Sequence, residues 1–196
     1  MIALLFFMSG GEQMNTVEPI RDISKVWDIA DYLKEQNERD YVMFLFGIYV
    51  GLRISDILKL HVRDVKDRNH VIIREQKTGK EKAFPINDEL RPILNRYIRG
   101  KAEYEWLFPS RRGDGHITRQ RAYQVLSDAG AKFGLEAIGT HTLRKTFGYH
   151  FYQQTKDIAT LKEILNHSDI SVTFRYIGIT QDIKDDKMRK LSFKQR

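Results

Sequence analysis

The hydrophobic pattern of this chain is mostly helical. From Ser24, the stretch SKVWDIADYLKEQ places apolar residues at three- and four-residue intervals, which predicts an amphipathic helix with Ser24 as its N-cap. Residues 39–51, RDYVMFLFGIYVG, are apolar almost all round, so they indicate a buried central helix that ends at Gly51. A short helix is expected in the ISDILKL that follows.

The central part of the chain has the pattern of strands. HVRDVKDRNHVIIREQ and KEKAFPI contain β-branched residues separated by turn residues around 67–69 and 78–79, which predicts a small three-stranded antiparallel sheet. The stretch 106–115, WLFPSRRGDG, is expected to be a loop because of its proline and glycines.

Further helices are predicted on both sides of that loop and in the last third of the chain. One runs from Asp88 to about Ile98, and another begins at Thr118 and is closed by Gly134. The last third predicts helices at 140–154, 157–166 and 169–177, with Asp157 and either Ser168 or Asp169 as N-caps, and then a polar tail at 180–192. The expected fold is therefore α+β, mainly α-helical with one small antiparallel sheet.

Length and composition narrow the class of protein. A chain of 196 residues with 41% hydrophobic and 11% aromatic residues can form one sizeable core. The absence of cysteine excludes disulfides, cysteine nucleophiles and thiolate-rich metal sites. The apolar run from Ile2 to Met8 is too short to span a bilayer and has no preceding basic residue. We therefore expect residues 1–19 to be a flexible leader, with Met14 as an alternative start, and the protein to be cytoplasmic.

The charge suggests an anionic partner. The net charge is +7 at pH 7, and nucleic acid is the commonest partner of a basic protein, although a merely soluble basic protein fits the charge equally well. Neither a GxGxxG nor a GxxxxGK[ST] phosphate loop occurs, so nucleotide hydrolysis has no support in the sequence.

Candidate functional residues occur in four separate stretches. Each of them taken alone also has a purely structural interpretation, such as an arginine held by Asp56, an exposed hairpin lysine, a helix-end histidine or a core tyrosine. Together they form a cationic set with one oxygen nucleophile and no acidic metal cluster, which suits attack on a phosphodiester. The members of the set are Arg53, Lys77, His141, Arg144, His167 and Tyr176.

These stretches carry a resemblance to a known family. GLRISDILKL, KTGKEKAFPI, HTLRKTF and LNHSDISVTFRY resemble the four catalytic boxes of the tyrosine recombinase, or phage integrase, family. All six residues occur in the order and at the spacing of that family, over about residues 20–192. The resemblance implies the catalytic-domain fold of DNA breaking-rejoining enzymes for residues 20–179, no metal or other cofactor, and double-stranded DNA as the substrate.

The resemblance also implies a role for each residue of the set. Tyr176 attacks the scissile phosphate and forms a 3′-phosphotyrosyl enzyme, while Arg53 and Arg144 hold the phosphate oxygens. Lys77 is the expected general acid for the 5′-oxygen; alignment of KTG with the hairpin turn favours it over Lys80. His141 is expected to act as acid and base toward Tyr176, His167 to hydrogen-bond the phosphate, and Asp56 to support Arg53. The helix containing TRQRAYQ is the expected DNA contact, through Arg119, Arg121 and Gln124, and Lys145 is a further candidate.

The sequence departs from the family pattern in three places. Asn166 stands where the family usually has glycine, and Lys145 where another histidine is frequent. Members of the family also carry an amino-terminal core-binding domain, whereas only about 20 residues precede the first helix here. The chain is thus either a fragment of a longer protein or a minimal recombinase.

Assembly and function follow from the resemblance as expectations. The tail at 180–196 has an amphipathic pattern in Ile183, Met188, Leu191 and Phe193, which fits packing on its own domain or on a neighbouring subunit. We expect a monomer or weak oligomer when free and a homotetramer on two DNA sites, with accessory DNA-bending proteins as further partners and no membrane association. The expected function is site-specific recombination; a DNA-binding regulator that retains the fold and a type IB topoisomerase-like enzyme are the alternatives.

Overall fold

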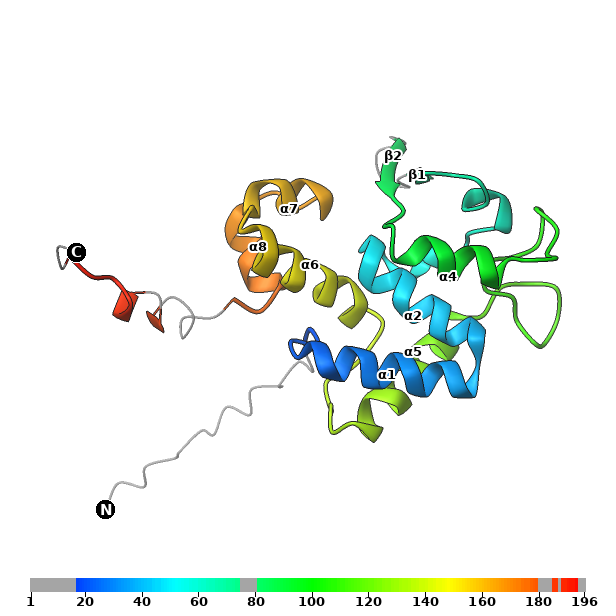
Figure 1. Ribbon diagram of the computed structural model, residues 1–196, viewed down its shortest axis with the longest axis horizontal. Coiled ribbons are helices and arrows are strands. Elements are labelled where there is room, and N and C mark those ends of the chain that lie inside the picture. Colours follow the sequence, from blue (N-terminus) through cyan, green and yellow to red (C-terminus); the bar gives the residue numbers. More distant parts are fainter. Residues whose placement is uncertain (1–16, 75–80, 180–184, 187, 194–196) are drawn as a thin grey trace, which may run out of the picture.

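The computed structural model describes residues 17–74, 81–179, 185–186 and 188–193. Two helices form a hairpin, a short helix and a small sheet follow, and the rest of the described chain is mostly helical (Figure 1). The elements are α1 (Ile23–Gln36), α2 (Glu38–Val50), α3 (Ile54–Ile57), the 3₁₀ turn η1 (Val62–Asp64), β1 (His70–Arg74), β2 (Glu81–Pro85), α4 (Leu90–Tyr97), α5 (Arg119–Lys132), α6 (Thr142–Thr155), α7 (Ile158–Ile164) and α8 (Ile170–Tyr176).

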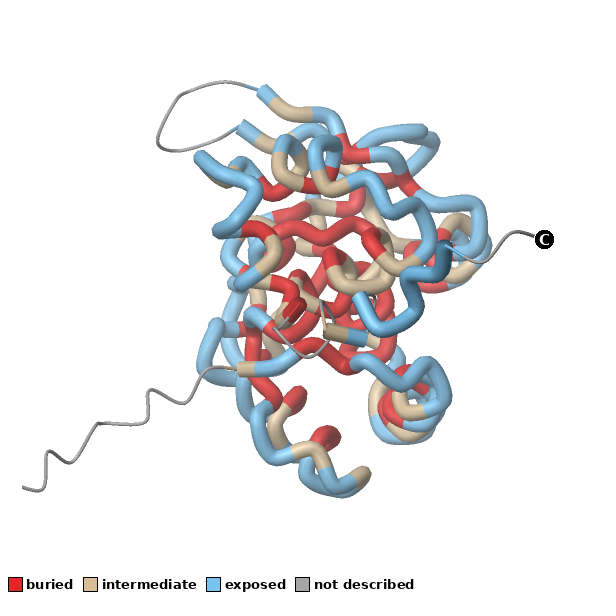
Figure 2. The backbone as a smooth tube through the Cα atoms, turned by 90° about the vertical axis from the view of Figure 1, so that its left-hand side faces the viewer, coloured by how far each residue is buried: buried red, intermediate tan, exposed pale blue. Residues whose placement is uncertain are grey.

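Helix α2 is the central element of the core, as its apolar sequence predicts. Its side chains include Phe44 and Phe46, which are 1% and 0% exposed, and it packs against α1, α4, α5 and α6. Figure 2 shows the buried backbone in the middle of the molecule and the exposed segments around it. Burial on all sides explains why this segment lacks the polar face that α1 has.

The helix caps agree with the sequence in several places and differ in two. Thr118, Asp157 and Asp169 accept hydrogen bonds from backbone N–H groups in the first turns of α5, α7 and α8. The N-cap of α1 is Asp22, not Ser24, because the Asp22 carboxylate accepts from the Ser24 backbone N–H at 2.8 Å.

The cap of α4 is the second difference. Helix α4 begins at Leu90, and its N-cap residue Glu89 makes no side-chain cap bond, whereas Asn87 accepts from the Glu89 N–H at 2.7 Å. Asp88, which the sequence suggested as the cap, therefore does not have that role.

The prediction of a third strand is wrong. Among the described residues the sheet has two antiparallel strands, with His70 paired to Pro85 and Arg74 to Glu81. The segment before β1 forms η1 instead, because Val62 and Val65 are both buried at a spacing of three, which a strand cannot provide. The Asp64 carboxylate stabilises this turn by accepting from the His61 N–H at 2.8 Å.

The last three helices enclose a second, smaller hydrophobic cluster. Leu161 and Leu165 from the α7 region and Ile177 after α8 are fully buried there, together with Tyr152 of α6. Helix α6 also packs on α2, so it connects this cluster to the main core. No helix in the described part of the chain is long and apolar enough to cross a membrane.

Candidate active site

The corner between α2 and α3 presents the first arginine of the set. Gly51 ends α2 in the left-handed conformation, with φ at 68°, and its N–H donates to Gly47 at 3.1 Å. Glycine is required because a Cβ at this position would collide with the Phe147 ring. The turn places Arg53 at the N-cap of α3, where it is exposed and available to a ligand.

Arg144 is buried, unlike Arg53. It is 5% exposed, and its guanidinium donates to two backbone carbonyls: Nη1 to Gly51 at 2.6 Å and Nη2 to Leu165 at 2.9 Å. These bonds join α6 to the α2–α3 corner and to the end of α7. Arg144 therefore fixes the geometry of the site in addition to providing positive charge.

His167 and Tyr176 are neighbours across the turn between α7 and α8. Their ring centroids are 5.0 Å apart in an edge-on arrangement, and His167 Nδ1 lies 3.1 Å from Thr173 Oγ1. Thr173 is fully buried and was not identified from the sequence. Its position three residues before Tyr176, on the same face of a helix, is the signal that could have indicated it.

The backbone conformation of Asn166 accounts for the presence of this residue where the family usually has glycine. It lies at the end of α7 with φ at 53°, a left-handed conformation that glycine adopts freely and asparagine tolerates better than most other residues. The turn brings the His167 N–H to the Lys162 carbonyl at 3.0 Å. Asn166 therefore stands at a position whose backbone conformation a glycine would also adopt freely.

The charges of the site act on one another. Burial raises the pKa of Tyr176, while the nearby charges of Arg144 and Arg53, and hydrogen bonding with Arg144, act in the opposite direction. Burial lowers the pKa of His167 and of His141, and the arginines lower both further. Near neutral pH the site therefore holds a protonated tyrosine and two neutral histidines beside two cationic arginines.

His141 is the N-cap residue of α6 and is exposed. After burial, the positive charge of Arg119 is the largest influence that lowers its pKa, followed by Arg144 and Arg53. The structure thus brings five members of the predicted set together, namely Arg53, His141, Arg144, His167 and Tyr176. The sixth, Lys77, lies outside the described residues.

A small hollow beside Arg53 and Arg144 adds a lysine that was given no role from the sequence. Lys82 of β2 lines this hollow, and its Nζ lies 3.4 Å from the Glu163 carbonyl. Lys82 shares the inward face of β2 with the buried Phe84, two residues on, and this alternation is the signal that distinguishes it. The other lining residues are Leu52, Asp56, Ile73, Ile164 and Asn166.

Asp56 was expected to support Arg53. Its carboxylate lies in the same hollow, but within the described chain no ion pair joins the two side chains. Burial lowers the pKa of Arg144, and the Asp56 charge is one of the smaller influences that oppose this shift. Asp56 thus contributes to the balance of charge around the buried arginine.

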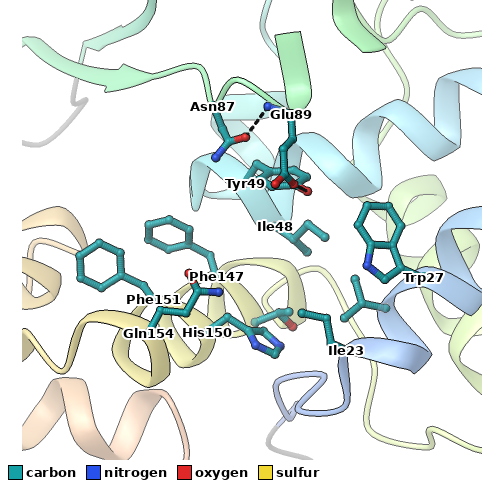
Figure 3. A pocket seen from close by; sticks show the side chains of 12 residues that line it. Ile23, Trp27, Ile48, Tyr49, Asn87, Glu89, Phe147, His150, Phe151 and Gln154 are labelled. Atoms are coloured by element: carbon teal, nitrogen blue, oxygen red, sulfur yellow. Dashed lines mark hydrogen bonds between the residues drawn. The ribbon is translucent and has the colours of Figure 1, made fainter. Parts of the chain in front are cut away.

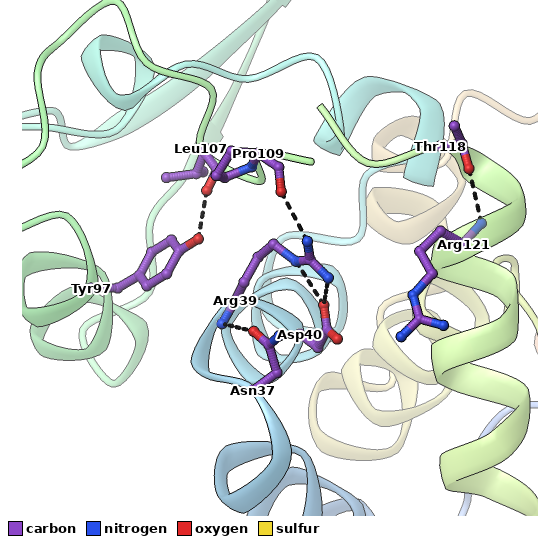
Figure 4. Close-up of polar contacts among 8 residues, drawn as sticks. All are labelled: Asn37, Arg39, Asp40, Tyr97, Leu107, Pro109, Thr118 and Arg121. Carbon is purple, nitrogen blue, oxygen red and sulfur yellow. Dashed lines mark hydrogen bonds and ion pairs between the residues drawn. The ribbon is translucent and has the colours of Figure 1, made fainter. Parts of the chain in front are cut away.

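Two of the predicted DNA contacts line the same hollow. Arg121 and Gln124 line a hollow of about 620 Å³ together with Arg111 and Arg112 of the loop before α5. Figure 4 shows how Arg39 holds this region: its guanidinium pairs with Asp40 at 2.7 Å and donates to the Pro109 carbonyl at 2.9 Å.

Lys145 does not face this hollow. It is half-buried, its Nζ donates to the Val17 carbonyl at 2.7 Å, and it lies 5.5 Å from the centroid of the Tyr176 ring. The sequence suggested Lys145 as a DNA contact and did not predict this position beside the tyrosine.

A separate groove of about 490 Å³ lies between α1, α2 and α6 (Figure 3). Its lining combines apolar side chains, among them Trp27, which is 42% exposed, and the half-buried Phe147 and Phe151, with polar ones such as Glu89 and His150. These two phenylalanines also pack on the second hydrophobic cluster with one side. No group of three or more metal-ligating side chains is present in the described part of the chain.

Comparison with known proteins identifies the family. The profile of the phage integrase family matches residues 20–182. A probable integrase/recombinase, YoeC, from Bacillus subtilis is 51% identical over 169 residues, which cover 86% of this chain and 93% of YoeC. The tyrosine recombinase XerD of Caulobacter vibrioides is 32% identical over 139 residues, 66% of this chain and 46% of that protein. The chain thus spans about half the length of this XerD relative.

Solved structures agree on the fold. A crystal structure of XerA recombinase superposes with a TM-score of 0.71 at 18% identity, over 90% of this chain and 65% of that one. A structure of XerH site-specific recombinase bound to a DNA substrate gives a TM-score of 0.67 at 17% identity, over 93% and 55%. The fold is that of a tyrosine recombinase catalytic domain. The chain belongs to the phage integrase family.

Proposed function

We propose that this protein is a site-specific recombinase that cuts and rejoins double-stranded DNA through Tyr176. The observation that carries the proposal is the position of Tyr176, which lies against His167 and within the field of Arg144 and Arg53. Guanidinium groups are suited to the non-bridging oxygens of a phosphodiester and to the extra charge of its five-coordinate transition state. DNA metabolism also makes the cytoplasm the expected location.

The proposed cleavage step balances in atoms and charge with the residues of the set. The Tyr176 oxygen forms a bond to phosphorus as the bond from phosphorus to the 5′-oxygen breaks. His141, kept neutral by its surroundings, takes the tyrosine proton, and Lys77 gives a proton to the departing 5′-oxygen. The phosphotyrosyl ester conserves the bond energy, so a 5′-hydroxyl of a partner strand can reverse the step without ATP or metal.

The three remaining residues of the set, Arg53, Arg144 and His167, hold the phosphate. Arg53 is exposed and can turn toward it, whereas Arg144 has two of its donors bound to backbone carbonyls and contributes its remaining donors and its charge. Because His167 Nδ1 is occupied by Thr173, the other ring nitrogen is the one assigned to a phosphate oxygen.

The assignment of the general acid can be tested between lysines of one hairpin. Lys77→Ala should abolish cleavage of a normal substrate and should be rescued by a substrate with a 5′-phosphorothiolate, whose sulfur leaves without a proton. Lys80→Ala should retain cleavage. Lys82→Ala, which removes a lysine from the hollow beside Arg53, should lower cleavage without rescue by sulfur.

DNA binding is assigned to the basic hollow before α5. Arg111, Arg112 and Arg121 provide exposed positive charge there, and Gln124 a polar side chain, which suits the phosphate backbone more than a specific base. Arg119 lies close enough to His141 to affect its pKa, so it extends the same surface toward the site.

The tail supports assembly of several copies on DNA. Met188, Leu191 and Phe193 are 73%, 67% and 90% exposed, so these side chains do not pack on their own domain. We assign them to a neighbouring copy, with the groove between α1, α2 and α6 as the surface that receives them, because apolar side chains such as Trp27 and Phe147 are part of its lining. A homotetramer on two duplexes, monomeric or weakly associated without DNA and helped by DNA-bending proteins, is the assembly proposed.

Two other functions remain as alternatives with specific outcomes. A DNA-binding regulator with this fold would bind its site and never form an adduct. A type IB topoisomerase-like enzyme would relax supercoiled DNA that lacks any specific site.

The test uses a site selected by the full chain from a random-sequence duplex library. A nicked duplex that carries this site is incubated with the protein and resolved on a denaturing gel. A covalent adduct that is lost in Tyr176→Phe, with DNA binding retained, is the expected result. Tight binding by the wild type without any adduct would overturn the proposal.

A further inference from the structure

The six residues before α1, Val17–Asp22, contact both α6 and the chain just after α8. We call this segment the strap. It runs along α6: the Ile20 N–H donates to Thr146 Oγ1 at 2.9 Å, and His150 Nε2 lies 2.9 Å from the Ile20 carbonyl. Because a carbonyl oxygen only accepts, the histidine donates here. The strap is therefore fixed to the helix that carries Arg144.

The other side of the strap contacts the chain just after α8. Arg21 Nη2 donates to the Gly178 carbonyl at 3.2 Å and pairs with Glu18 at 3.3 Å. Gly178 follows Tyr176 by two residues and has φ at 70°. A Cβ at Gly178 would lie 2.8 Å from Arg21 Nη2, so the close approach of the guanidinium depends on this glycine.

A second contact reaches the tyrosine itself. Lys145 donates to the Val17 carbonyl at 2.7 Å, and the same ammonium lies 5.5 Å from the centre of the Tyr176 ring. A cation at this distance attracts the face of an aromatic ring. The strap thus holds a charge against the ring of Tyr176 and a guanidinium against the turn that follows it.

Helix α8 needs such support. It has seven residues, of which Thr173 is the buried one, and Ile170 and Val172 are about 40% exposed. A helix this short with so little buried surface gains little stability of its own, so its position depends on neighbouring contacts. The bonds through Arg21 and Lys145 connect it to α6, where Arg144 is rigidly held.

We propose that Arg21 and Lys145 are positioning residues, which act through the strap to hold Tyr176 in register with Arg144. The proposal rests on the proposed function, because it concerns the placement of the same nucleophile. Neither side chain touches the reacting atoms. Their removal should therefore slow cleavage without weakening the binding of DNA.

The experiment compares variants of the full chain in single-turnover cleavage of the selected nicked duplex. Arg21→Ala should cleave about tenfold more slowly, since a hydrogen bond from a charged group contributes about that factor. The affinity for the same duplex should stay within about twofold, and Arg21→Lys, which restores a cationic donor, should recover most of the rate. Lys145→Met should change the rate in the same direction.

The matched control is Lys25→Ala. Lys25 also donates to a backbone carbonyl, that of Phe133 at 2.9 Å, but it contacts neither α8 nor the strap's partners on α6. Hydrogen–deuterium exchange of residues 170–179, measured without DNA, should speed up in Arg21→Ala and stay unchanged in Lys25→Ala. Arg21 is exposed, so its truncation leaves the core intact.

The outcomes separate the two proposals. If the wild type forms no adduct, the proposed function is contradicted. If the wild type cleaves and Arg21→Ala cleaves equally fast, the positioning role alone is overturned. Loss of cleavage in Arg21→Ala that parallels a loss of DNA affinity, or that appears equally in Lys25→Ala, would also overturn it.

Discussion

The guanidinium of Arg144 donates to the carbonyl oxygen of Gly51 at 2.6 Å, and Gly51 lies two residues before Arg53. This bond ties the two arginines of the site to one backbone corner. Since Arg144 also donates to Leu165, which precedes His167 by two residues, one buried side chain sets the relative position of three members of the site.

The two arginines should respond differently to truncation. Arg144→Ala leaves two buried carbonyls without a donor and should lower the free energy of unfolding by about 2–4 kcal/mol, besides abolishing cleavage. Arg53→Ala removes an exposed side chain and should change the free energy of unfolding by less than about 0.5 kcal/mol while also abolishing cleavage. Urea denaturation and adduct assays measure both effects. Equal destabilisation by the two variants would contradict the structural role of Arg144.

Gly51→Ala tests the backbone turn between α2 and α3. A side chain there must adopt φ at 68° and collide with Phe147, so we expect a loss of at least about 2 kcal/mol in the free energy of unfolding. Gly134→Ala is the matched control, because its φ is 70° and no atom lies within 4 Å of the added Cβ. It should lose about 1 kcal/mol from backbone strain alone. If both variants unfold at the same urea concentration, the contact with Phe147 does not matter.

The histidines predict a dependence of stability on pH. The pKa of His167 is lowered in the folded protein by burial and by the arginines, so the unfolded chain binds a proton first as the pH falls. The contribution of His167 to the free energy of unfolding is therefore present above the ordinary histidine pKa of about 6.5, and it is lost as the pH falls below that pKa. Thermal melts between pH 8 and 5 should show this decline, and His167→Gln should make it shallower. A melting temperature that rises as the pH falls would contradict the sign.

Two basic residues of α5 allow a test of which surface of this helix binds DNA. Arg121 lines the basic hollow near the start of α5, whereas Lys132 lies at the other end and faces the Tyr32 ring at 4.2 Å. Arg121→Ala should weaken binding and reduce the slope of log affinity against log salt by about 0.9, the value of one phosphate contact. Lys132→Ala should leave the slope unchanged. Equal slopes for Arg121→Ala and the wild type would remove Arg121 from the interface.

The tail should matter for assembly and not for folding. Leu191→Asp combined with Phe193→Asp changes two side chains that are 67% and 90% exposed, so the melting temperature of the free protein should stay the same. Sedimentation on the selected duplex should show fewer copies bound together than for the wild type. A lower melting temperature would indicate that the tail packs on its own domain, against the assignment to a neighbouring copy.

Much of the fold and of the candidate site could be predicted from the sequence alone. The apolar α2 segment, the caps at Thr118, Asp157 and Asp169, and the order of the six catalytic candidates depend on local patterns that can be read along the chain. The extra strand was mispredicted because Val62 and Val65 suit a strand by residue type, while their burial follows the spacing of a 3₁₀ turn. Residue type favours an element, but packing against the rest of the core selects it.

The tertiary structure decided which side chains meet. Lys145, one residue after Arg144, lies over the Tyr176 ring while its ammonium donates to the strap, and Arg21 contacts Gly178 across 157 residues of sequence. Whether Arg144 is a rigid, buried anchor or a free phosphate ligand also depends on carbonyls from distant turns. Sequence patterns record local hydrogen bonding and burial, whereas these contacts arise from chain segments that only folding brings within reach.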